Sequence, residues 1–153
     1  MCPHSEDRSS FQYPIRGLLQ IKGILKEEEI RHPTSLDKNG EECLFVIKSG
    51  NSTGVTIGRG SGIESFVREY SDYGIKSTSM EIAIYPYNHK SDAFSAPGDS
   101  GSIVVDGLGR IVGLLTAGSG KIESTDVAYA TPYFWLEEKI KKAFPDSYLY
   151  IKE

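Results

Sequence analysis

The 153-residue chain contains little cysteine, only Cys2 and Cys43. A framework of several disulfides is therefore excluded, and the two thiols show neither Cys-x-x-Cys redox spacing nor the spacing of a structural zinc site. Because Cys43 lies at the start of an apolar segment, we expect two free thiols, although one bridge between them is conceivable. No cofactor and no metal are expected from this composition.

Other absences narrow the class of protein further. The net charge is -4, the pI is near 5.4, and basic residues form no cluster, so nucleic acid is not an expected partner. No apolar run approaches the length of a membrane span, and residues 1–7 lack the apolar core of a signal peptide. Neither a membrane partner nor a compartment is therefore assigned, and no internal repeat or low-complexity segment interrupts the chain.

The most informative stretch is residues 96–102, which read APGDSGS and lead into the apolar run 103–105. Glycines on both sides of Ser100 let the backbone turn sharply and approach a substrate without Cβ clashes. The amides of Gly98 and Ser100 could converge on one point, as an oxyanion hole requires. A serine held in this way at the mouth of a strand is typical of a covalent nucleophile.

A glycine–aspartate–serine triplet alone is weak evidence, because all three residues are common in turns. Here residues 106–109 (DGLG) predict a tight turn, and residues 110–118 predict a second apolar strand after it. The triplet therefore opens a predicted β-hairpin, which makes the functional interpretation stronger.

This region resembles the nucleophile region of the chymotrypsin/trypsin-like serine proteases. Residues 98–102 (GDSGS) and 113–118 (GLLTAG) carry the likeness, and residues 46–58 resemble the K-x-G-x-x-T-G-x-x-x-G segment of microbial members, including fungal ones. The likeness extends from about residue 17 to residue 144. It implies a mainly β fold, namely a single six-stranded antiparallel Greek-key barrel with a C-terminal helix, the second half of a double-barrel protease.

The same resemblance implies roles for individual residues. Ser100 would be the nucleophile, and the Gly98 and Ser100 amides would form the oxyanion hole. The carboxylate of Asp99 would order the loop by pairing with a cation that the sequence does not identify; the alternative is a simple turn-forming aspartate. The residues that would bind substrate are Phe94, Thr116, Ala117 and Gly118.

Phe94 lies six residues before the serine, where trypsin-like members carry an acid at the base of the specificity pocket. The pocket is therefore expected to be apolar or shallow and not selective for lysine or arginine. Phe94 as a loop residue that covers the core is an equally good interpretation.

The general base is not found at its expected place. In the family the order is histidine, aspartate, serine, with the first two roughly 140 and 90 residues before the serine. Here only 99 residues precede Ser100. The histidines His4, His32 and His89 are each expected to be surface imidazoles, and the spacing of Asp7 is interpreted as coincidence because no apolar strand follows it.

The remaining pattern predicts the element order. Strands are expected at residues 17–25, 43–48, 53–59, 79–86, 103–105, 110–118 and 125–130, and residues 63–70 are expected to be a further extended segment of the hairpin that contains 53–59. Residues 51–53 are expected to form a tight turn and the acidic run 26–29 a loop. Thr131 would cap a final helix, in which Trp135 would anchor to the sheet and which Pro145 would end. The expected organisation is an inter-barrel linker at 1–16, the barrel and helix at 17–145, and a tail at 146–153.

Three functions remain open at this point. The first is the C-terminal half of a serine endopeptidase, which would act on peptide or protein substrates once completed by an N-terminal barrel and would be inactive alone. The second is a non-catalytic pseudoprotease that acts as a binding module. The third is a lipase-type Gly-Asp-Ser hydrolase, which the mainly β pattern disfavours.

Overall fold

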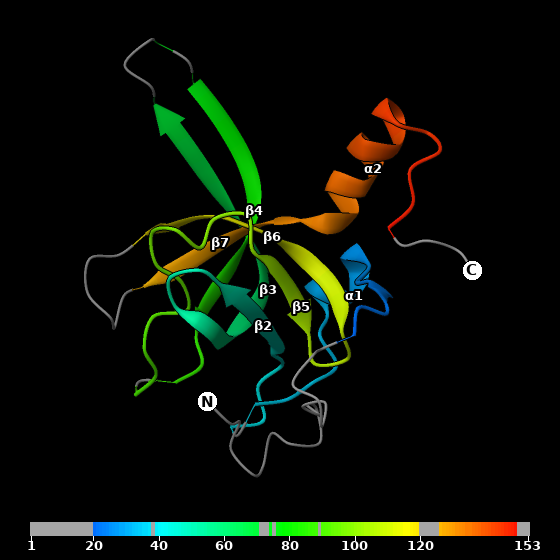
Figure 1. The fold of residues 1–153 in the computed structure, drawn as a ribbon. Helices are drawn as coiled ribbons and strands as arrows, with labels where there is room; N and C mark the ends of the chain where they lie inside the picture. Colours follow the sequence, from blue (N-terminus) through cyan, green and yellow to red (C-terminus); the bar gives the residue numbers. More distant parts are fainter. Residues whose placement is uncertain are drawn as a thin grey trace.

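The computed structural model describes residues 20–37, 39–70, 74, 76–88, 90–119 and 126–149. The expected linker at 1–16, with Cys2, His4 and Asp7, lies outside this part of the chain, as does His89. The elements are β1 (Gly23–Ile24), α1 (Glu27–Arg31), β2 (Leu44–Gly50), β3 (Gly54–Tyr70), β4 (Lys76–Pro86), β5 (Ile103–Asp106), β6 (Arg110–Ser119), β7 (Val127–Pro132) and α2 (Tyr133–Ala143). The expected mainly β fold with a C-terminal helix is confirmed (Figure 1).

The seven strands of the described residues belong to one sheet, in the order β1-β6-β5-β2-β3-β4-β7. Strand β7 pairs with both β4 and β6, so the pairings β2–β3–β4–β7–β6–β5 run in a closed ring. We expected six strands, all antiparallel. The sheet differs from this expectation because β1 adds a seventh strand, which pairs parallel to β6. The hairpin predicted after Ser100 is confirmed as β5–β6.

The N-terminal part of the sheet differs from the sequence-based expectation. The strand predicted at 17–25 is reduced to Gly23–Ile24 in the described residues, and the acidic run predicted as loop forms α1. Glutamate is a good helix former, Glu29 accepts a hydrogen bond from the backbone of Lys26, and Arg31 pairs with Glu27 one turn earlier. Ile30 is buried in the core, so tertiary packing holds this short helix in place.

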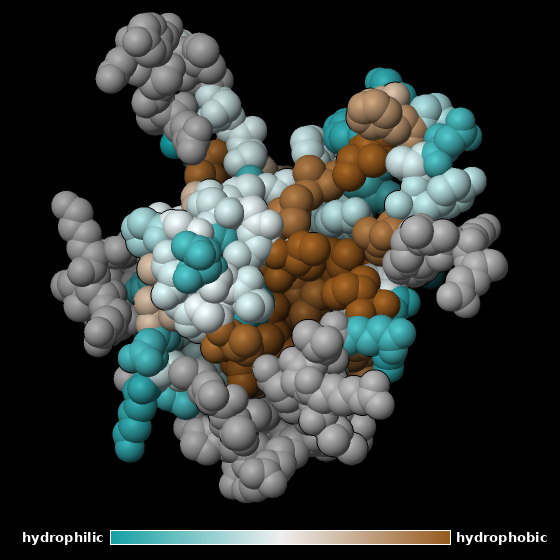
Figure 2. All heavy atoms as spheres, in the orientation of Figure 1, coloured by the Kyte–Doolittle hydropathy of each residue, from teal (hydrophilic) through white to brown (hydrophobic). Residues whose placement is uncertain are grey.

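The alternation of side chains along the central strands produces two apolar layers. Val46, Val104 and Val112 point into the main core and are fully buried. Their neighbours on the opposite face of the sheet are Ile47, Val105 and Ile111, which form a second cluster against Ile21 and Tyr133. Figure 2 shows a hydrophobic surface in the region of β5 and β6, so these strands are apolar on both faces.

The end of the chain begins its helix later than expected. Strand β7 continues through Thr131 to Pro132, and Pro132, not Thr131, is the N-cap residue of α2. Trp135 is 46% exposed and lies under Lys139 Nζ, so it does not anchor the helix. Phe134 packs against the main core instead.

Within the described residues, no helix is long and apolar enough to cross a membrane.

Candidate active site

Ser100 lies in the turn that leads into β5, and the backbone on both sides of it is held in place. The Asp99 amide donates to Ala96 O at 3.0 Å, and the Gly101 amide donates to Leu115 O at 2.7 Å. The Ser102 hydroxyl donates to Asp99 O at 2.6 Å. Ser100 itself is exposed. The loop therefore presents one serine hydroxyl to solvent from a backbone fixed to β6.

The amides of Gly98 and Ser100 differ from those of their neighbours. Among the hydrogen bonds of the described residues, neither amide donates to a protein acceptor, while the amides of Asp99 and Gly101 both do. Gly98 has φ +101°, a conformation that residues with a side chain rarely adopt, and a Cβ there would lie 2.4 Å from Ser52 Oγ. Two free donors next to the serine hydroxyl are what an oxyanion site requires.

The cation that pairs with Asp99 is Lys48, on β2. Lys48 Nζ lies 3.0 Å from Asp99 Oδ2, and both side chains are fully buried. Asp99 Oδ1 accepts from the Ser52 amide at 2.7 Å, and Asp99 Oδ2 accepts from the Thr53 hydroxyl at 2.7 Å and from the Ala96 amide at 3.1 Å. Lys48 also donates to the Thr53 hydroxyl and, at 3.3 Å, to Gly54 O. Each carboxylate oxygen is therefore satisfied.

These contacts fix the ionisation state of Asp99. Burial by itself raises the pKa of this carboxyl, but hydrogen bonds from Thr53, Ser52, Lys48 and Ala96 act in the opposite direction and outweigh it. The pKa of Asp99 is therefore held well below its ordinary value. The loop is built around a permanent carboxylate, not around a turn-forming aspartate exposed to water.

The segment 46–58, noted in the sequence only for its resemblance, surrounds this ion pair. Its lysine is Lys48, its threonine is Thr53, and residues 51–53 form the expected tight turn. A Cβ on Gly50 would lie 2.3 Å from Asp99 Oδ1, and a Cβ on Gly58 would lie 2.6 Å from the ring of Phe94. Gly50 and Gly58 thus allow the close approach of Asp99 and Phe94. Lys48, Ser52 and Thr53 were not recognised in the sequence as partners of Asp99.

A cavity of about 210 Å³ lies directly beside Ser100. The residues that line it are Ser95, Ala96, Pro97, Ser100, Leu115, Ala117, Gly118 and Asp126. Two of the predicted substrate-binding residues, Ala117 and Gly118, are therefore brought together with the predicted nucleophile. Asp126, just before β7, was not identified from the sequence, where nothing distinguishes it from other acidic residues.

The other two predicted substrate-binding residues lie elsewhere. Phe94 is fully buried in the main core and does not line this cavity; Lys48 Nζ lies 5.7 Å from its ring centre. This position matches the interpretation of Phe94 as a core-covering residue. The Thr116 hydroxyl donates to Tyr129 O at 3.2 Å, so it faces β7.

Strand β6 leaves part of one edge unpaired. Its edge toward β5 is occupied as far as Leu115, whose amide donates to Ser102 O at 2.9 Å. From Thr116 to Ser119 the pairings of the described chain lie only on the β7 side. An extended peptide could add to the free edge at Thr116–Gly118 as a further strand, next to Ser100.

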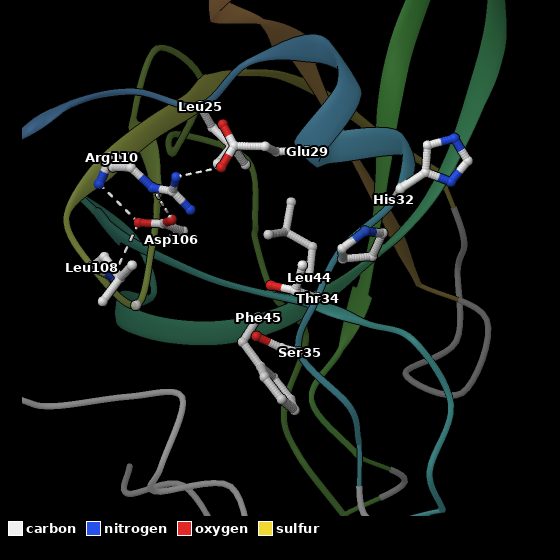
Figure 3. A pocket seen from close by; sticks show the side chains of 12 residues that line it. Leu25, Glu29, His32, Thr34, Ser35, Leu44, Phe45, Asp106, Leu108 and Arg110 are labelled. Carbon is white, nitrogen blue, oxygen red and sulfur yellow. Dashed lines mark hydrogen bonds and ion pairs between the residues drawn. The ribbon is translucent and has the colours of Figure 1, made fainter.

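A second cavity of about 210 Å³ lies at the turn end of the β5–β6 hairpin, between α1 and β2 (Figure 3). Arg110 bridges its two carboxylates: Arg110 Nε donates to Asp106 at 2.7 Å and Arg110 Nη1 donates to Glu29 at 2.6 Å. This hydrogen bond to Arg110 lowers the pKa of Glu29. Because these three charged side chains are already paired with one another, we assign them a structural role and not a ligand-binding one.

His32 lines this second cavity and not the cavity beside Ser100. It is an exposed residue that follows α1, as expected for a surface imidazole. His4 and His89 lie outside the described residues. The described part of the chain thus places no imidazole in the cavity with Ser100, and no group of three or more His, Cys, Asp or Glu residues in that part could hold a metal ion.

Comparison with known proteins supports the fold. The crystal structure of the chymotrypsin of Cellulomonas bogoriensis matches the chain with a TM-score of 0.51 and 20% sequence identity, over 83% of this chain and 54% of that chain. The chain therefore has a chymotrypsin-like fold and spans about half the length of that protease. No family model matches the sequence, and no curated protein matches it.

Proposed function

We propose that this chain is the nucleophile-bearing half of a chymotrypsin-like serine endopeptidase. The observation that carries the proposal is the arrangement around Ser100: an exposed hydroxyl, two amides that find no acceptor among the described residues, and a buried ion pair that holds the loop. The chymotrypsin-like fold and the share of that protease spanned by the chain support the same interpretation. The histidine and aspartate would come from a second unit.

In this mechanism Ser100 Oγ attacks the carbonyl carbon of a peptide bond and gives its proton to the imidazole of the second unit. The carbonyl oxygen takes up the displaced electron pair, and the Gly98 and Ser100 amides stabilise the resulting oxyanion. The C–N bond then breaks, the imidazolium protonates the leaving amine, and water hydrolyses the acyl-enzyme. The Lys48–Asp99 pair does not react; it positions the loop.

The chain alone would have very little activity. Removal of the base from a complete protease lowers kcat by about 10⁶-fold, roughly 8–9 kcal/mol of barrier. The oxyanion donors remain in such an enzyme, so they alone do not replace the base. A small external base can substitute in part, because Ser100 is exposed to solvent.

Labelling with a fluorophosphonate, followed by peptide mass spectrometry, tests the proposal on the chain as it exists. We expect slow modification at Ser100 that increases with imidazole concentration and disappears in Ser100→Ala. Ser35→Ala is the matched control, since Ser35 lines the second cavity, and it should label like the wild type.

Two results would contradict this proposal. Modification that is independent of imidazole and spread over several hydroxyls would make the chain a binding module with a protease-like fold. Fast labelling at Ser100 without imidazole would mean that the chain supplies its own base, so the second unit would not be needed.

A further inference from the structure

Strands β3 and β4 continue beyond the rest of the sheet as a two-stranded arm (Figure 1). In the described part of the chain, β2 pairs with β3 only as far as Gly60, and β7 pairs with β4 only from Ile82 onwards. Beyond these residues the two strands pair with each other alone. A register shift between Gly60 and Glu64, of the kind that bends a strand, separates the arm from the sheet. Both outer edges of the arm are therefore open to pairing with another strand.

The centre of the arm carries two large apolar side chains on one face. Phe66 on β3 lies directly opposite Met80 on β4, and these side chains are 75% and 44% exposed. Glu64 and Arg68 lie on the same face as Phe66, because side chains two residues apart point to the same side of a strand. A two-stranded ribbon of this kind is marginally stable in water, and additional strands stabilise it.

The edge of β3 is complementary to itself. A two-fold axis at Phe66 brings a second copy of the strand alongside in the antiparallel direction. Phe66 then lies opposite Phe66 of the second copy, and Glu64 lies opposite Arg68 of the second copy on each side of the axis. Opposite charges that face each other across two strands are stabilising, as are aromatic pairs. Met80 of each copy extends this apolar row across four strands.

The other groups near this edge are compatible with the pairing. Glu64 Oε1 accepts from Arg31 of α1 at 2.7 Å, and a carboxylate has capacity for further hydrogen bonds from a second arginine. The outer edge of β4 offers no such match: among residues 77–81 the one charged residue is Glu81, which is buried. Charge complementarity therefore selects the β3 edge and a second copy of the same edge.

We propose that the arm is a self-association surface, on which the β3 edges of two copies of this chain pair antiparallel about Phe66 and form one four-stranded sheet. The inference goes beyond the proposed function, because no residue of the arm lines the cavity beside Ser100. A single short strand edge buries less than the about 1,600 Å² of a standard interface, so the dimer is weak and forms at high protein concentration.

Reversal of the two charges tests the pairing in the full chain. Sedimentation equilibrium over a range of protein concentrations measures the dissociation constant of the dimer. We expect Arg68→Glu and Glu64→Lys each to weaken self-association by about 10-fold or more, because each variant places like charges opposite each other twice. An equimolar mixture of the two variants should associate about as strongly as the wild type, since every facing pair again has opposite charges.

Lys139→Glu is the matched control, because it reverses an exposed charge on α2, away from the arm. It should leave the dissociation constant unchanged. The control also shows whether the total charge of the chain, and not the position of the charges, governs association.

Cysteine placement tests the register of the pairing. In a Cys2→Ser background, Phe66→Cys places two thiols opposite each other, and mild oxidation should link the two copies. In Val67→Cys the new residue lies opposite Ser65 of the second copy, so the two thiols are too far apart for a disulfide. Non-reducing gel electrophoresis of the two variants compares the yields of the linked dimer.

Three results would overturn the proposal. They are a wild type that remains monomeric at millimolar concentration, a mixture of the charge variants that associates no better than either variant alone, and equal linkage in the two cysteine variants. These results are independent of labelling at Ser100, so a failed self-association surface can be told apart from a failed nucleophile.

Discussion

Lys48 Nζ and Asp99 Oδ2 lie 3.0 Å apart with no exposure to solvent, and they join β2 to the loop that carries Ser100. The two residues are 51 positions apart in the sequence. Since Asp99 precedes the proposed nucleophile directly, the position of Ser100 depends on an internal lysine. The pair therefore couples the stability of the fold to the geometry of the candidate site.

Removal of the lysine charge should be strongly destabilising. Lys48→Met leaves the Asp99 carboxylate buried without its counter-ion, which costs about 3–5 kcal/mol, and chemical denaturation would measure this loss. The double variant Lys48→Met/Asp99→Asn should recover part of it, because no buried charge remains unpaired. Arg31→Met, at exposed ion pairs with Glu27 and Glu64, should cost much less; equal losses at the two sites would contradict this account of the Lys48–Asp99 pair.

Close approach at Gly50 gives a second prediction. In Gly50→Ala the new Cβ would lie 2.3 Å from Asp99 Oδ1 and 2.8 Å from Lys48 Nζ, so the strand or the loop must move, at a cost of about 1–3 kcal/mol. Gly60→Ala is the control, because its Cβ would meet Leu44 at an ordinary 3.6 Å. Thermal unfolding should show a lower Tm for the first variant and little change for the second.

Asp126 should lower the stability of the free protein at neutral pH. Because burial raises its pKa in the folded state, folding is favoured while the group is protonated and loses stability as the pH rises through the ordinary value of about 3.9 towards the raised one. Asp126→Asn should therefore be more stable than the wild type at neutral pH, and the difference should vanish below about pH 4.

Glu29→Gln should behave in the opposite way. The hydrogen bond to Arg110 lowers the pKa of Glu29, so its contribution to stability is present above the ordinary value and is lost as the pH falls. Denaturation curves for the two variants at several pH values would check both signs. A pH-independent gain in Asp126→Asn would mean that the carboxylate is not responsible.

Local pattern was enough to predict much of the sheet. The alternation in 79–86 predicted a strand, and the turns before β3 and before β6 predicted two hairpins between neighbouring segments, which formed as expected. Helix α1 was missed because its N-cap residue, Lys26, is not a usual capping residue and because a run of glutamates is typical of exposed loops. Its only buried residue, Ile30, is held by tertiary packing that a local pattern does not reveal.

The part of the site that one sequence segment forms could be predicted, whereas the contacts between distant segments could not. The glycines on both sides of Ser100 are enough to predict a sharp backbone turn. The partner of Asp99 could not be chosen, because Lys48 reaches it only through the β2–β5 pairing. Asp126 joins the cavity because β6 pairs with β7, a contact between strands that no motif in the sequence marks.

The most direct test of the central claim, that the loop is shaped for acyl transfer at Ser100, is a crystal structure of the chain phosphonylated at that residue. The account predicts that the phosphoryl oxygen lies about 2.7–3.1 Å from the amide nitrogens of both Gly98 and Ser100. A phosphoryl oxygen that points into solvent, with these two amides bonded elsewhere, would contradict it.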